Sequence, residues 1–242
     1  MVLVRDGQTQ PATTATVYVK DDMIRRDQAT GLSTILDLTS DITFLVDHRN
    51  RTCATIPNKS IAARRSNFNA MLSANTNLSS TADVKPLGQT RVIAGKPAKG
   101  YKFATTIKAS QKGNNANRVT IQISGEQWVS EELALTPAMQ REMGYGLVRT
   151  LGSTLGAGAK PLAAKLAKIK GFPLVVCTNM TISGSLRQMN GPFKRAFVTT
   201  MTAKEVSQEP LDDKLFVVPD NYREIAPDPS QMPTMENYTL IN

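Results

Sequence analysis

The stretch VYVKDDMIRRD, residues Val17–Asp27, shows the pattern that recurs along the chain. Two short β-like runs flank the acidic pair Asp21-Asp22. Side chains with a period of two lie on alternate faces of a strand, and a short polar break favours an antiparallel turn. The stretch therefore predicts a β-hairpin within a larger sheet. Arg25 and Arg26 are neighbours in its second strand, so we expect them on opposite faces rather than in one basic surface.

Alternation of apolar and polar residues is the main signal in the rest of the sequence as well. In the run from Ile42 to Asp47, for example, every second residue is apolar. Short polar turns between such runs predict an antiparallel meander that begins near Ala15. The strands that we expect are Ala15–Lys20, Met23–Gln28, Ser33–Leu38, Ile42–Asp47, Thr52–Ile56, Gly88–Ala94, Lys99–Lys108, Arg118–Ser124, Glu126–Val129, Pro173–Ser183, Lys194–Val206 and Phe216–Val218.

Two helices are expected in the middle of the chain. Thr136-Pro137 has the composition of an N-cap followed by a first-turn proline. After it, apolar residues recur at four-residue steps and form one helical stripe. The second helix, Pro161–Ile169, carries Lys165 and Lys168 on its polar side. The members of the first stripe are Met139, Met143, Leu147 and Leu151.

The length of 242 residues is compatible with one β-rich domain. We expect this domain to span residues 1–225. The small polar residues within 58–87 predict a flexible insert, and the proline-rich residues 226–242 predict an extended tail.

Composition excludes several classes of function. The net charge of +9 favours anionic partners in general. Aromatic residues are scarce and lie in core-like runs, so no base-stacking nucleic-acid site is expected. With one histidine, His48, and two distant cysteines, no zinc site or other cofactor is expected. Cys53 and Cys177 are open to two interpretations, a disulfide or two free thiols. No run approaches the length of a membrane span.

No catalytic motif is found. Ser-His-acid or thiol chemistry would need His48, which lies in a turn between strands, and there is no Gly-x-Ser-x-Gly motif. The glycine-rich run Gly152–Lys160 lacks the hydroxyl residue that follows the lysine of a phosphate-binding loop. We therefore expect a protein that is not an enzyme.

The order of several short motifs carries a resemblance to a known family. These are VYVKDDMIRRD, TILDL (Thr34–Leu38), IAGKPAKGYKF, EQWVSEEL, KGFPLVV and a final LFVVPDNY. The sequence resembles an uncharacterised bacterial family of exported domains, whose layout is similar to the LolA/LolB and LppX lipoprotein-carrier fold. The resemblance implies an α+β, mainly β domain, in which a curved antiparallel sheet forms an unclosed half-barrel and helices cover its concave face. It also implies a periplasmic or otherwise extracytoplasmic location, with a leader removed before Met1.

We expect a lipid or another hydrophobic ligand to bind between the sheet and the helices. The candidate lining residues are Phe44, Trp128, Met139, Met143, Leu147 and Leu151. Lys165 and Lys168 are candidate contacts with the membrane surface. The alternative is a structural or protein-interaction domain of the bacterial cell envelope, in which the helices are permanent core and no ligand binds.

Overall fold

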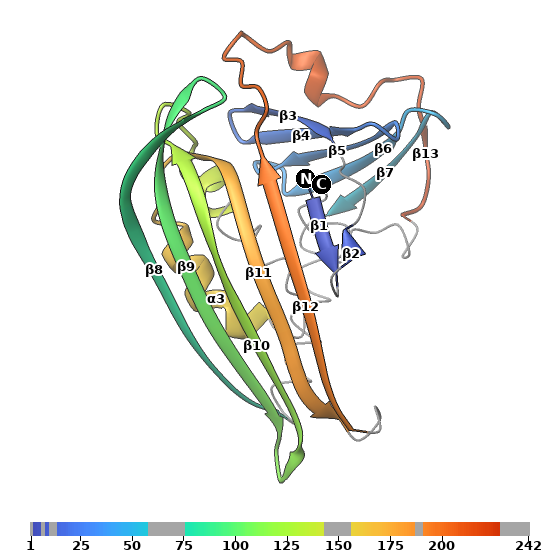
Figure 1. The fold of residues 1–242 in the computed structure, drawn as a ribbon. Coiled ribbons are helices and arrows are strands. Elements are labelled where there is room, and N and C mark those ends of the chain that lie inside the picture. The colour runs from blue at the N-terminus through green and yellow to red at the C-terminus, as the bar shows by residue number, and fades with distance from the viewer. Residues whose placement is uncertain are drawn as a thin grey trace.

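Most of the regular structure is β-sheet, arranged as two sheets (Figure 1). The structure is a computed structural model, and it describes residues 2–5, 8–9, 14–57, 76–142, 156–186 and 191–227. Few helices accompany the strands in these ranges. The chain is therefore mainly β within the α+β class, as the sequence predicts.

The first sheet has six strands in the order β13-β7-β6-β5-β4-β3. Five of them form an antiparallel meander, and β13 adds to β7 in parallel. The predicted hairpin at the start is confirmed, because Tyr18 pairs with Arg25 and Lys20 pairs with Met23. The strands are β3 (Ala15–Lys20), β4 (Met23–Gln28), β5 (Leu32–Asp37), β6 (Ile42–Asp47), β7 (Thr52–Pro57) and β13 (Arg223–Glu224).

The second sheet has seven strands in the order β2-β1-β12-β11-β10-β9-β8 and is antiparallel throughout. Its long strands run together away from the six-stranded sheet and end in the β9–β10 hairpin (Figure 1). We call this far end of the long strands the distal end. The strands are β1 (Val2–Arg5), β2 (Gln8–Thr9), β8 (Thr76–Ile93), β9 (Lys96–Gln111), β10 (Asn114–Ser130), β11 (Phe172–Leu186) and β12 (Gly191–Thr202).

Three helical segments are described. Residues 137–142 form a short helix, and its predicted N-cap is confirmed: the Thr136 hydroxyl accepts from the Met139 N–H at 3.2 Å. The α-helix α3 (Gly156–Leu166) packs against the seven-stranded sheet. A 3₁₀ helix, η2 (Asp213–Phe216), lies where the sequence predicted a strand at Phe216–Val218.

Three hydrophobic clusters form the interior. The largest joins α3 to β9, β10 and β11. The second lies on the six-stranded sheet around Ile35, Val46 and Cys53. The third surrounds Trp128 and Leu174. The protein thus has a separate core on each sheet and on each face of the long strands.

The sequence predicted one curved sheet, but the strands form two separate sheets. The meander of β3–β7 does not continue into the long strands, because β13 occupies the free edge of β7 and β8 pairs only with β9. The expectation that sheet structure begins near Ala15 is also corrected, since β1 precedes it. One pair, β13 with β7, is parallel rather than antiparallel.

The predicted insert 58–87 extends too far. Residues 76–87 belong to the edge strand β8, where exposed polar side chains are compatible with a strand. Residues 58–75 and 228–242 lie outside the described residues. Arg118–Ser124 and Glu126–Val129 are one strand, because Gly125 continues β10 rather than ending it. The second helix begins at Gly156 and ends at Leu166, earlier than predicted at both ends.

Candidate hydrophobic-ligand site

One face of the seven-stranded sheet is apolar across four neighbouring strands. Cross-strand partners in an antiparallel pair point to the same side. The register pairs Ile107 of β9 with Ile121 of β10, and Ile121 with Ile182 of β11. Ile123 pairs with Met180, and Met180 pairs with Phe197 of β12. We call this side the apolar face.

Helix α3 covers the β8–β9 side of the apolar face. Ala159, Leu162 and Ala163 are completely buried there with Ile107. The close approach depends on Gly158, because a β-carbon at this position would lie 2.5 Å from Cγ2 of Ile107. Lys165 reaches over the sheet edge and donates to the Ala82 carbonyl at 2.6 Å. The helix is therefore held by core packing and by a contact with the edge strand.

The apolar face continues beyond the buried residues under α3. Met180, Ile182 and Met201 pack against the same cluster but are only partly buried. Phe193 and Phe197, on the same side of β12, are also partly buried, and the exposed Arg195 lies between them opposite Ile182. Large apolar side chains that stay only partly buried on a sheet face are typical of a ligand or partner site.

The sequence did not identify these β11 and β12 residues as ligand contacts. Met180 and Ile182 are two residues apart, and Phe197 and Met201 are four apart. This even spacing places the two residues of each pair on the same side of their strand. It does not tell which strands become neighbours. Alternation thus showed that each strand has an apolar side. Only the pairing of distant strands showed that these sides lie on one face of one sheet.

Two of the predicted lining residues, Phe44 and Trp128, lie in different hydrophobic clusters. Phe44 packs on the six-stranded sheet against Val218 and Tyr222. Trp128 lies on the face of β10 opposite α3, against Ala98 and Leu174. The Arg91 guanidinium lies 4.1 Å from the centroid of the Trp128 ring, at a cation–π distance.

Met139 is fully buried in the 137–142 helix. Its neighbour Gln140 fixes this helix to the chain after α3, because its side-chain amide donates to Ile169 O and accepts from the Gly171 N–H. The remaining predicted lining residues, Met143, Leu147 and Leu151, lie outside the described residues.

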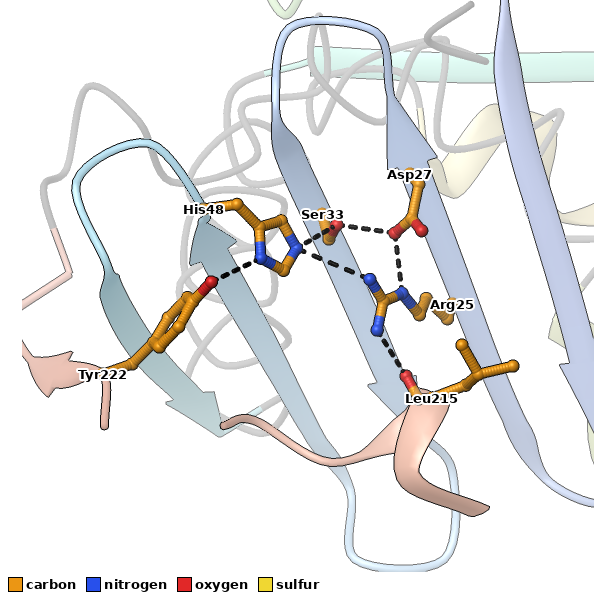
Figure 2. A network of polar contacts seen from close by, with 6 residues as sticks. All are labelled: Arg25, Asp27, Ser33, His48, Leu215 and Tyr222. Atoms are coloured by element: carbon orange, nitrogen blue, oxygen red, sulfur yellow. Dashed lines mark hydrogen bonds and ion pairs between the residues drawn. The ribbon is translucent and has the colours of Figure 1, made fainter. Parts of the chain in front are cut away.

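The only histidine takes part in a polar network on the six-stranded sheet (Figure 2). His48 Nδ1 lies 2.8 Å from the Tyr222 hydroxyl, and Nε2 lies 2.8 Å from Ser33 Oγ. Ser33 Oγ lies 2.5 Å from Asp27 Oδ1, which also accepts from Arg25 Nε at 2.7 Å. Tyr222 is 174 residues from His48 in the sequence, so the sequence gave no sign of this network.

The short contacts determine the direction of the hydrogen bonds. An ionised carboxylate only accepts, so Ser33 donates to Asp27. Ser33 Oγ then accepts from His48 Nε2–H at 2.8 Å, which leaves Nδ1 to accept from Tyr222. Arg25 Nη2 approaches Nε2 only to 3.5 Å, and in this tautomer the contact joins two donors and is not a hydrogen bond. A serine nucleophile needs the opposite arrangement, in which the imidazole accepts from the hydroxyl. Ser33 is also only 3% exposed. The network is therefore not arranged as a hydrolase triad.

The network holds a C-terminal strap, residues 213–225, against the sheet. Arg25 Nη1 donates to Leu215 O at 2.7 Å, and Figure 2 shows Arg25 between the strap and Asp27. The backbone of the strap bonds to β7 through Ile225 N and Cys53 O at 2.8 Å. Phe216, within the strap, is itself buried.

The prediction that adjacent arginines would point in opposite directions agrees with these contacts. Arg25 faces the strap, whereas strand alternation places Arg26 on the other side of β4. Burial there lowers the pKa of the Arg26 guanidinium to about 10. The two side chains thus form no joint basic surface.

Both cysteines are free thiols on different sheets. Burial raises the pKa of the Cys53 thiol, and the nearby Glu224 carboxylate raises it further. Within the described ranges, no cluster of three His, Cys, Asp or Glu residues is placed to hold a metal ion. In the same ranges, no helix has the length and apolar character needed to cross a membrane.

Comparison of the chain with protein-family models, with curated proteins and with solved structures found no match.

Proposed function

We propose that the protein is a non-enzymatic binding protein for a lipid or another hydrophobic guest in an extracytoplasmic compartment. The guest lies on the apolar face, over β11 and β12 and beside α3. One observation carries the proposal: the apolar face extends past the residues buried under α3, and its continuation is only partly buried.

The driving force is the burial of apolar surface. Covering a hydrocarbon surface contributes about 25 cal/mol per Å², or about 0.8 kcal/mol for each methylene group of an acyl chain. Met180 and Met201 are suited to such a guest, because unbranched thioether side chains adapt to varied apolar shapes. Association itself costs several kcal/mol, so a guest with a long acyl chain is needed for measurable affinity.

The resemblance to the lipoprotein-carrier fold supports the same proposal. In that fold a helix-covered antiparallel sheet holds the guest. Here an unclosed antiparallel sheet carries α3 on its apolar face. The acyl chains of a lipid or lipoprotein are therefore the guests that we propose.

The test is native mass spectrometry after purification without detergent. We expect the full chain to carry lipid adducts. The variant Met180→Gln places a polar group on the apolar face and should lose them, whereas Asn179→Gln, on the opposite face of the same strand, should keep them. A wild-type chain that neither carries nor takes up a fluorescent fatty acid would contradict the proposal.

A second candidate is a structural or protein-interaction domain of the bacterial envelope. The complete burial of Ala159, Leu162 and Ala163 favours it, because a helix packed in this way is permanent core rather than an exchangeable lid. The lipid-binding experiment above distinguishes the two candidates. Only a carrier binds a lipid probe at the apolar face.

A further inference from the structure

The distal end of the seven-stranded sheet is strongly basic. Five exposed cations lie there: Lys108, Lys112, Arg118, Lys194 and Arg195. The sequence has no Asp or Glu between residues 104 and 124 or between residues 178 and 200. Within the described ranges, none of the five forms an ion pair. The nearest acidic residue on β8, Asp83, is paired with Lys85 at 2.8 Å.

The register concentrates three of these cations on one surface. Lys108 pairs with Thr120, Thr120 pairs with Ser183, and Ser183 pairs with Lys194. Arg118 lies two residues before Thr120 on β10. Strand alternation places all of them on the face opposite α3. We call Lys108, Arg118 and Lys194 the basic tip.

A groove of about 480 Å³ lies at the same end of the sheet. The groove has a polar and an apolar part. Lys108 and Arg118 line the polar part with Asn77, Ser79, Ser110 and Thr120, and Leu78, Ala109 and Val119 line the apolar part. Lysine, arginine, serine and threonine side chains all donate hydrogen bonds, and phosphate oxygens accept them. The chemistry of the groove therefore fits a phosphate-bearing anion.

From these observations we infer that the distal end docks on the surface of an anionic lipid membrane, with lipid phosphate groups at the basic tip. Apolar residues on the other face of the same strands favour a membrane. Leu78 is exposed and Phe193 is partly buried at this end, next to the cations but on the apolar face. A tip with basic and apolar sides matches the boundary between headgroups and acyl chains.

A nucleic-acid partner fits this surface less well. Single-stranded nucleic acid stacks its bases on aromatic side chains that lie among the cations. Ser110, Thr120 and Ser183 lie between the cations of the basic tip, and the nearby Phe193 points to the other face. The basic tip therefore supplies charge and hydroxyl groups without a stacking platform. Arg195 lies beside Phe193 and Phe197, but on the apolar face.

The inference places the membrane contact on the basic tip, whereas the sequence suggested Lys165 and Lys168. Lys165 already donates to the Ala82 carbonyl, which leaves it less free to follow a membrane surface. The inference goes beyond guest binding, because it depends on the charge distribution and not on an occupied apolar face.

The test is co-sedimentation of the full chain with phosphatidylcholine vesicles that contain about one-third phosphatidylglycerol. The triple variant Lys108→Gln, Arg118→Gln and Lys194→Gln should bind about 100-fold more weakly, at about five-fold for each cation. The control triple Lys160→Gln, Lys168→Gln and Lys170→Gln removes the same charge from exposed sites in and after α3 and should lose only a few-fold. Wild-type binding should disappear at high salt.

Equal losses in the two triple variants would overturn the inference, because they would show a general charge effect. Tighter binding of a single-stranded oligonucleotide than of the vesicles would overturn it in favour of nucleic acid. Circular dichroism verifies that both variants fold. Native mass spectrometry of the same samples reports guest binding separately, so failure of the docking inference is distinguishable from failure of the proposed function.

Discussion

Tyr222→Phe removes one hydroxyl group and tests how the C-terminal strap is held. The hydroxyl donates to His48 Nδ1 at 2.8 Å in a partly buried site. Its loss removes one hydrogen bond and leaves the imidazole acceptor unpaired, at a cost of about 1–2 kcal/mol. The strap should detach more readily, because Tyr222 also packs on the second hydrophobic cluster.

Urea unfolding at neutral pH measures the free energy of unfolding, and amide exchange of residues 213–225 measures the local opening of the strap. Tyr18→Phe is the matched control, since its hydroxyl has no hydrogen-bond partner among the described residues. We expect the control to change stability by less than about 0.5 kcal/mol.

A double-mutant cycle of Tyr222→Phe with His48→Phe isolates the interaction. The network predicts a coupling free energy of about 1 kcal/mol between the two side chains. Additive effects in the cycle, or equal effects of Tyr222→Phe and Tyr18→Phe, would refute the role that we give to the hydroxyl.

The remaining predictions concern packing and pH. Gly158→Ala should lower the free energy of unfolding by about 1–3 kcal/mol, because its β-carbon collides with Ile107. In the Ile107→Ala background this penalty should largely disappear, and stabilisation by the alanine in the wild-type background would contradict the packing of α3. The Asp47 carboxyl accepts hydrogen bonds from Asn50 and from the Arg49 N–H. These bonds lower its pKa, and those from Asn50 have the largest effect. This stabilisation is complete above about pH 4, the unfolded carboxyl pKa, and is lost as the pH falls through the lower folded value. Asp47→Asn should therefore cost about 0.5 kcal/mol in urea unfolding at pH 7 and almost nothing at pH 2, whereas an equal cost at both values would contradict the assignment.

Local alternation predicted the short strands well. Ala15–Lys20, Met23–Gln28 and Ile42–Asp47 form as expected, and each ends at a polar turn. Among them, only Ile42–Asp47 contains fully buried side chains. The turn after Lys20 contains Asp21 with φ 50°, a conformation that aspartate adopts more readily than most residues.

The long strands were harder to predict. Gly125 looked like a break between two strands, but the Cys177 carbonyl of β11 and the ring of Phe103 on β9 occupy the space where a side chain would lie. Residues 76–87 looked mobile because they are small and polar, yet an edge strand tolerates such residues on its exposed side. In both cases pairing with a distant strand outweighed the local composition.

The candidate site depended even more on distant pairing. The sequence placed Met139 in a helix and Trp128 in a strand, but it did not tell on which side of the sheet each would lie. The apolar face requires β11 to pair with both β10 and β12, and this register joins residues about 60 positions apart, as Ile123 and Met180 show. Composition alone excluded the usual zinc ligands, whereas the asymmetric placement of charge appeared only with the sheet register.

Photo-crosslinking with a diazirine fatty acid tests the central claim most directly. The full chain is loaded with the probe, irradiated and digested, and the labelled peptides are identified by mass spectrometry. The account predicts that label concentrates on the peptides that contain Met180 and Met201, and that an unlabelled fatty acid in excess competes it away. Label that spreads evenly over both faces of the sheet, or that is absent from these two peptides, would contradict guest binding on the apolar face.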